Sequence, residues 1–368
     1  MIGRRELYDP AAVAGLVTQV REVAARLARR VTLMEVCGTH TNAIAAAGLR
    51  RLLPDAVRLI SGPGCPVCVT PVGYVDRAEA LARRPGTTVC TFGDLMRVPS
   101  STGSLEATHA AGGDVRVVYS PRDAVEIARA NSDCAVVFLG VGFETTVPTI
   151  AAALAEAEAG GVDNFTVLAG HKVMPPPLKA LAGDPEVQVD GFICPGHVSV
   201  ITGWKAFSYL PEEYRTPAVI AGFTPTDVLR AVLELVTQLA DGRAEVANLY
   251  SRVVTAEGNR TALALVERFF APSDAVWRGL GMIPGSGLDL RPEFAHRDAG
   301  RIAVEVPEPE EPAGCRCGEV LKGMIDPPEC PLFGTTCSPA QPVGACMVSS
   351  EGACAAWYRH ERLAGGAA

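Results

Sequence analysis

Short apolar runs recur along the chain, and each ends in a glycine-rich or polar loop that precedes a helical pattern. Residues 31–36 lead into C-G-T-H-T, residues 57–60 into S-G-P-G-C-P-V-C, and residues 135–139 into G-V-G-F-E-T-T. Further runs of this kind cover residues 87–92, 115–119, 165–169, 191–194 and 218–221. Their β-branched content and flanking Gly and Pro favour strands over buried helices. This alternation predicts parallel sheets built from βαβ units.

The pattern falls into two halves that resemble each other. L-M-E-V-C-G-T-H-T is similar to V-F-L-G-V-G-F-E-T-T, and I-S-G-P-G-C-P is similar to I-C-P-G-H-V-S. We therefore expect two parallel-sheet α/β domains of similar topology, over residues 31–133 and 134–240.

The two ends of the chain lie outside these halves. In residues 1–30, Asp9 and Pro10 are typical of the N-cap and first position of a helix. Residues 241–368 contain a helical pattern, an acidic proline-rich linker and a cysteine-rich tail. We expect this last part to form a small third domain, with the N-terminal helix packed on it.

Composition narrows the function. Hydrophobic residues make up 48% of the 368, which is ample for a folded core, and the longest apolar runs are too short to span a membrane. A net charge of −8 argues against nonspecific nucleic-acid binding. No signal-peptide pattern opens the sequence, so we expect a cytoplasmic protein.

The tail is unusually rich in cysteine, with six of the twelve cysteines within forty residues. They are Cys315, Cys317, Cys330, Cys337, Cys346 and Cys354. Disulfides are rare in the cytoplasm, and the tail has none of the paired C-x2-C knuckles common in structural zinc sites. Four scattered thiolates are what a cubane iron–sulfur cluster requires. We favour a cluster, with zinc or structural thiols as alternatives.

Cys37 lies in C-G-T-H, where a strand is expected to end and a helix to begin. The helix dipole favours a thiolate at such a position, and His40 could orient a proton or a ligand. The alternative is a buried cysteine that only fills space.

Cys65 and Cys68 form a C-P-V-C pair in the next loop. This spacing allows a reversible disulfide, and it could also supply half of a zinc site. Because no second pair of this kind completes a zinc site, dithiol redox chemistry is favoured.

Two further loops carry titratable groups. Glu144 lies in G-F-E-T-T and His197 in P-G-H-V-S, which we expect at the same end of the sheet. Each could serve as an acid–base group or a docking contact, or could be an ordinary cap or surface residue.

Five motifs follow one another along the chain: C-G-T-H, G-P-G-C-P-V-C, G-F-E-T-T, P-G-H-V-S and C-M-V-S-S-E-G-A-C. In this order they resemble the HypD family of [NiFe]-hydrogenase maturation proteins. The resemblance covers nearly the whole chain. It implies two Rossmann-like α/β domains and a small domain that holds a [4Fe–4S] cluster. It also implies a role in building the Fe(CN)2CO unit of the hydrogenase, with a HypC-type chaperone and a HypE-type cyanide donor, on behalf of the hydrogenase large-subunit precursor.

The resemblance also assigns residues. The family's cluster spacing falls on Cys315, Cys330, Cys337 and Cys354, with Cys315 and Cys317 the hardest pair to separate. Cys37 would hold the iron of the Fe(CN)2CO unit together with a thiolate of the chaperone. Cys65 and Cys68 match the family's redox-active pair.

Two other functions remain open from the sequence. The chain could be an iron–sulfur-dependent thiol–disulfide reductase resembling ferredoxin–thioredoxin reductase. It could also be a non-enzymatic docking scaffold with a structural cluster. The motifs do not decide whether the protein is an enzyme.

Overall fold

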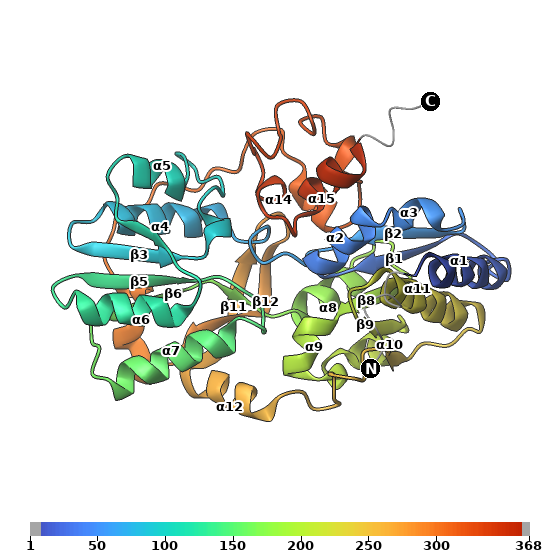
Figure 1. Cartoon of the computed structure of the whole chain (residues 1–368), viewed down its shortest axis with the longest axis horizontal. Helices are drawn as coiled ribbons and strands as arrows, with labels where there is room; N and C mark the ends of the chain where they lie inside the picture. Colours follow the sequence, from blue (N-terminus) through green and yellow to red (C-terminus); the bar gives the residue numbers. More distant parts are fainter. Residues whose placement is uncertain (1–8, 363–368) are drawn as a thin grey trace.

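The computed structural model describes residues 9–362 of the chain. Residues 1–8 of the predicted N-terminal segment and residues 363–368 of the predicted C-terminal domain lie outside the described residues. Two α/β bodies lie side by side, and the cysteine-rich segment, orange to red, covers the junction between them (Figure 1).

The first body contains a five-stranded parallel sheet in the order β10-β9-β8-β1-β2. Its strands are β1 (Val31–Glu35), β2 (Val57–Ser61), β8 (Gly191–Pro195), β9 (Ala218–Ala221) and β10 (Val246–Asn248). Helices of this body are α1 (Pro10–Ala24), α2 (Gly38–Ala46), α3 (Leu49–Leu52), α9 (Gly196–Thr202), α10 (Tyr209–Tyr214) and α11 (Pro225–Ala240).

The second body contains a four-stranded parallel sheet in the order β4-β3-β5-β6. Its strands are β3 (Thr87–Thr91), β4 (Val115–Val117), β5 (Ala135–Gly140) and β6 (Phe165–Ala169). Its helices are α4 (Val72–Arg83), α5 (Leu105–Ala110), α6 (Pro121–Ala130) and α7 (Val147–Ala159).

The parallel α/β class is as predicted, but the division at residues 133 and 134 is wrong. Strands β1 and β2 share a sheet with the late strands β8, β9 and β10 through the β1–β8 pair, whereas β3 and β4 share the other sheet with β5 and β6 through the β3–β5 pair. The chain therefore crosses between the bodies more than once. A short apolar run does not show which other strand it will pair with, because tertiary packing decides the order of strands in a sheet.

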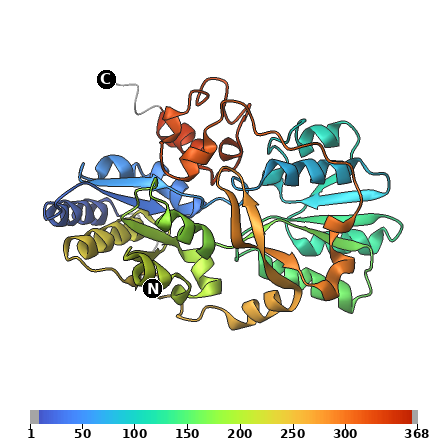
Figure 2. The same ribbon diagram turned by 180° about the vertical axis from the view of Figure 1, so that it is seen from behind.

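A third, antiparallel sheet lies between the two bodies (Figure 2). It consists of β11 (Phe270–Trp277), β12 (Gly281–Leu290) and the short β7 (His171–Lys172). Helix α8 (Pro175–Gly183) packs on β12, and α12 (Arg260–Phe269) bridges α7 and α9. None of the helices in residues 9–362 is long and apolar enough to cross a membrane.

Helix α1 starts as predicted, with the Asp9 side chain accepting a hydrogen bond from the Ala11 amide. Its predicted packing on the cysteine-rich tail is wrong. Val17 and Val20 are buried instead in an apolar cluster with α11 and the five-stranded sheet. The apolar stripe of α1 faces that sheet, so the helix belongs to the first body.

The cysteine-rich segment contains α13 (Cys317–Leu321), α14 (Ala345–Val348) and α15 (Ala353–His360), joined by loops and short 3-10 turns. The 3-10 turn of this segment is η6 (Pro327–Glu329). Four other 3-10 turns lie earlier in the chain, at Gly93–Leu95, Trp204–Phe207, Pro292–Arg297 and Ala299–Arg301. Buried residues of the segment, such as Leu321 and Met347, join the large apolar cluster that also contains residues of both bodies. Within residues 9–362 the segment therefore has no core of its own.

Arg50 fixes this segment to the first body. Its guanidinium donates to the Leu59 carbonyl at 3.2 Å and to Ser61 Oγ at 3.0 Å, and it pairs with Glu361 Oε1 at 2.5 Å. The Arg50 and Glu361 side chains are only 11% and 7% exposed, so solvent screens this ion pair weakly.

We expect Arg50→Met to lower the free energy of unfolding by about 3 kcal/mol, because it leaves the Glu361 carboxylate buried without its partner. Arg58→Met is the matched control, since Arg58 pairs with Asp326 where both side chains are about one-third exposed. That change should cost about 1 kcal/mol or less. Equal losses in urea unfolding would contradict the anchoring role of Arg50.

Candidate functional site

Three predicted site motifs meet at the carboxyl end of the five-stranded sheet. Strands β8, β1 and β2 are neighbours there, and they lead into His197, Cys37 and Cys65 respectively. Parallel strands present their carboxyl ends at one sheet edge, where α/β proteins bind ligands. Cys37 and Cys65 therefore follow their strands at this edge as expected, whereas His197, predicted in a loop, lies in the first turn of α9.

Backbone packing brings the loop with Cys65 directly onto Cys37. The Gly38 amide donates to the Gly64 carbonyl at 2.9 Å, and a Cβ on Gly64 would lie 2.2 Å from the Cys37 nitrogen. Only glycine permits this approach of two backbones. The G-P-G-C motif thus holds the C-P-V-C pair beside Cys37.

Cys37 is the N-cap residue of α2, as predicted. The effect of burial on the pKa of its thiol is nevertheless larger than the effect of the helix N-terminus. Burial raises the pKa of the Cys37 thiol to about 12, although the backbone amides of Thr39 and His40 act in the opposite direction. The neighbouring carboxyl groups of Glu351 and Glu35 raise this pKa further. The thiol of the free protein is therefore protonated at neutral pH.

Glu35 is a buried acid outside the predicted set of site residues. Its carboxyl group accepts hydrogen bonds from the Cys37 amide at 3.2 Å and from Thr41 Oγ1 at 2.6 Å. Burial raises its pKa to about 7, while hydrogen bonds to the carboxylate oppose that rise. The signal was a charged residue inside the apolar run L-M-E-V before Cys37.

Glu351 is the second missed acid, and it comes from the cysteine-rich segment. Thr39 Oγ1 donates to Glu351 Oε1 at 3.0 Å, and a Cβ on Gly38 would lie 2.3 Å from Glu351 Cβ. Thr39 and Glu351 line a cavity of about 660 Å³ beside α2. The segment therefore forms one wall of the pocket next to Cys37.

His40 does not orient a group at the Cys37 sulfur through its ring. The ring is fully buried, its Nε2 contacts the Gly222 carbonyl at 2.9 Å, and burial lowers its pKa to about 4. Its ring stacks on Phe223, which also stacks on His197 with centroids 3.9 Å apart. His197 is exposed, and burial of part of its ring lowers its pKa.

Cys65 and Cys68 are joined in a disulfide. The Cys68 amide donates to the Cys65 sulfur at 3.1 Å, and the Cys68 sulfur lies 3.9 Å from the Ala345 carbonyl oxygen. Ala345 directly precedes Cys346. The disulfide therefore lies against the cysteine-rich segment on one side and against the Cys37 loop on the other.

All six cysteines of the tail line one cavity. The other lining residues are Val320, Leu332, Phe333, Gly344 and Met347. The Val343 amide donates to the Cys337 sulfur at 3.3 Å. Burial raises the pKa of Cys354, and the sulfurs of Cys315 and Cys337 add to that rise. Thiols far apart in sequence thus converge in an apolar pocket.

The six cysteines line this cavity without forming a single-ion metal site. In the part of the chain that the structure describes, no group of three His, Cys, Asp or Glu side chains is arranged around a single metal-ion position. The donor set is a shell of thiols around a space, and both Cys315 and Cys317 belong to it.

Glu144 does not share the sheet edge of Cys37, so that expectation is wrong. It follows β5 of the four-stranded sheet, whereas His197 follows β8 of the other sheet. Glu144 is 7% exposed, and its Oε1 accepts a hydrogen bond from the Met174 amide at 2.9 Å. Burial raises its pKa to about 7.

We expect Glu144→Gln to reduce the pH dependence of stability between pH 5 and pH 8. Folding raises the pKa of Glu144, so the folded protein binds this proton more tightly than the unfolded chain and loses stability as pH rises through about 7. Glutamine has no proton to lose, so the stability of the variant relative to the wild type should rise by about 1–3 kcal/mol between pH 5 and pH 8.

Urea unfolding at the two pH values measures this difference. Glu257→Gln is the control, because its partner Lys205 lowers the pKa of the exposed Glu257, which is charged at both pH values. An unchanged pH dependence in Glu144→Gln would show that this carboxyl group is not protonated on folding.

Comparison with known proteins gives a consistent result. The family model described as "HypD: Hydrogenase formation hypA family" matches residues 11–361. The chain is 49% identical to the hydrogenase maturation factor HypD of Rhizobium leguminosarum bv. viciae, over 91% of this chain and 90% of the relative. It is 45% identical to the HypD of Escherichia coli (strain K12), over 97% of each chain. The chain belongs to the HypD family of hydrogenase maturation factors.

Proposed function

We propose that this maturation factor is a scaffold and redox protein that assembles the Fe(CN)2CO unit of a [NiFe]-hydrogenase. One observation carries the proposal: the Cys65–Cys68 disulfide contacts the Cys37 loop through Gly64 and the cysteine-rich segment through Ala345. A thiol, a disulfide and a shell of thiols thus form one continuous path. Cysteines that only fill space in the core would not need to be arranged as a thiol, a disulfide and a thiol shell in sequence.

The thiol shell fits a [4Fe–4S] cluster as resident cofactor. Its donors are soft thiols and its other lining residues are apolar, which matches the thiolate ligation and restricted solvent access of such clusters. Cys315, Cys330, Cys337 and Cys354 would hold the cluster, with Cys317 and Cys346 as neighbouring thiols. When bound, the cluster supplies single electrons to the nearby disulfide.

Cys37 would bind the iron of the Fe(CN)2CO unit, which is cargo. Because burial keeps its thiol protonated, the thiolate forms only when iron replaces the proton, which makes binding conditional on the metal. Glu35 is the adjacent carboxyl group, and its pKa near 7 suits it to accept that proton. The exposed His197 would flank the approach beside Phe223, and the buried His40 would support this stack from below and hold the Gly222 loop.

The electrons of a reductive cyanide transfer are accounted for if the dithiol of the C-P-V-C pair is the electron donor. The carbon–sulfur bond of a thiocyanate on a HypE-type donor breaks, its sulfur leaves as a thiolate, and the cyanide carbon bonds to iron. This cleavage consumes one electron pair, which Cys65 and Cys68 provide as they close to the disulfide. Two single electrons from a one-electron reductant protein, together with two protons, then restore the dithiol.

The 660 Å³ cavity beside α2 would receive a HypC-type chaperone. It is lined by Thr39, Asn42, Phe223 and Glu351 among others, and it opens next to the residue that holds iron. Pockets with an apolar surface and a few polar groups suit such docking. The completed unit would pass from the chaperone complex to the hydrogenase large-subunit precursor.

Cys37→Ala should abolish maturation of the hydrogenase and leave the cluster absorbance of the purified protein unchanged, because Cys37 does not line the thiol shell. Cys194→Ala is the control, a fully buried cysteine in the adjacent strand β8. Normal maturation with Cys37→Ala would refute the iron-binding role and would favour a disulfide reductase without iron cargo.

Cys354→Ala should lower the iron and acid-labile sulfide content of the protein, since Cys354 lines the thiol shell. The matched control is Cys90→Ala, which removes a buried thiol from the core of the four-stranded sheet. If iron and sulfide stay at the wild-type level in Cys354→Ala, the proposed ligand set is wrong.

A further inference from the structure

Arg278 is a buried cation between the disulfide loop and the cysteine-rich segment. It lies in the turn that joins β11 to β12 and is 1% exposed. Its amide donates to the Val69 carbonyl at 2.9 Å, one residue after Cys68. A Cβ on the next residue, Gly279, would lie 2.4 Å from Gly318 Cα, one residue after Cys317. The turn is therefore clamped on both sides.

The guanidinium of Arg278 is only partly paired. Its Nη2 donates to the Pro99 carbonyl at 3.0 Å, and its Nε lies 3.8 Å from Glu311 Oε1, too far for a hydrogen bond. Among the described residues, the buried Nε and Nη1 have no hydrogen-bond acceptor. Leaving buried charged donors unsatisfied is costly, so these two nitrogens point to a missing acceptor.

The turn that carries Arg278 lies directly against the thiol shell. Gly279 and Glu311 line one pocket together with the shell cysteines Cys315 and Cys317. The buried cation of Arg278 therefore borders this shell.

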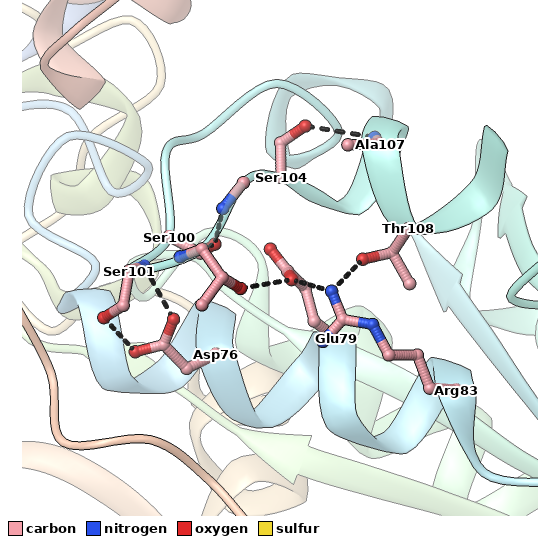
Figure 3. Close-up of polar contacts among 10 residues, drawn as sticks. Asp76, Glu79, Arg83, Ser100, Ser101, Ser104, Ala107 and Thr108 are labelled. Atoms are coloured by element: carbon pink, nitrogen blue, oxygen red, sulfur yellow. Dashed lines mark hydrogen bonds and ion pairs between the residues drawn. The ribbon is translucent and has the colours of Figure 1, made fainter. Parts of the chain in front are cut away.

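The contacts of the loop after η2 (Gly93–Leu95) fix the Pro99 carbonyl and so the orientation of the guanidinium. The Ser101 amide and hydroxyl both donate to Asp76 on α4, each at 2.8 Å (Figure 3). Ser101 Oγ also accepts a hydrogen bond from the Glu310 amide at 3.0 Å, which places the linker that carries Glu311. The acidic linker at residues 305–312 is therefore attached to α4 at this point.

We propose that Arg278 is a positioning residue for the sulfur-bound cluster, where its charge and free donors stabilise the reduced form and raise the midpoint potential. This inference rests on the proposed function, because it requires a cluster in the thiol shell. Four thiolate ligands make such a cluster anionic, and reduction adds negative charge. A fixed, desolvated cation and donors near the sulfurs therefore favour the reduced state.

The test is a redox titration of the full-length protein with its cluster, followed by electron paramagnetic resonance, in wild type, Arg278→Gln and Arg278→Lys. The expected result is a midpoint potential that shifts to more negative values in Arg278→Gln at unchanged iron content. Arg278→Lys keeps the charge and should restore most of the potential. Arg316→Gln is the control, because Arg316 follows Cys315 but keeps 39% of its side chain exposed and is paired with Glu319.

Each outcome decides a separate point. An unchanged midpoint in Arg278→Gln, or an equal shift in Arg316→Gln, would overturn the inference and leave the proposed function intact. If Arg278→Gln loses iron, recovery of iron in Arg278→Lys supports the role of charge, and equal loss in both variants contradicts it. If the purified wild-type protein contains no iron and no sulfide, the proposed cluster is wrong, and so is the role of Arg278 that depends on it.

Discussion

The arrangement depends on close backbone contact at two glycines, Gly38 and Gly64. Gly64 lets the C-P-V-C loop pack on the Cys37 backbone, and Gly38 lets Glu351 of the cysteine-rich segment pack on the start of α2. A side chain at either position would separate layers that now touch. Three segments, from the end of β1, the end of β2 and the C-terminal part of the chain, therefore meet around one thiol.

Burial at this junction gives the groups unusual proton affinities. The same low-dielectric surroundings raise the pKa of both Cys37 and Glu35 and lower that of His40. Each group is thereby held neutral, or close to the point where it changes charge, at neutral pH. Under the proposed function, such a site would bind a metal by exchanging a proton for it, which would couple cargo binding to proton release.

The sequence was sufficient for the local features. The capped start of α1, the loop positions of Cys37 and Cys65, and the redox-competent C-P-V-C spacing each follow from short-range rules. Strand order was not predictable, because short parallel strands carry no record of their neighbours and the chain returns to the first sheet at β8. For the same reason Glu144 was placed at the wrong sheet edge, since its loop resembles the C-G-T-H loop locally.

Side-chain direction was the other limit. The sequence places His40 near Cys37, but the helical turn directs its ring to the carbonyl of Gly222, directly after β9. The two residues are 182 positions apart in the sequence, so no local pattern predicts their contact. Arg278 lies in no recognisable motif, and Glu351 lies in the C-M-V-S-S-E-G-A-C stretch, whose pattern does not say that it packs on α2. Both residues gain their roles only from tertiary packing.

Infrared spectroscopy of the chain purified with a HypC-type chaperone from cells that mature the hydrogenase tests the central claim most directly. The account predicts bands of iron-bound cyanide and carbonyl that are present in the wild-type complex. An intact complex with a full iron–sulfur cluster and no such bands would contradict it.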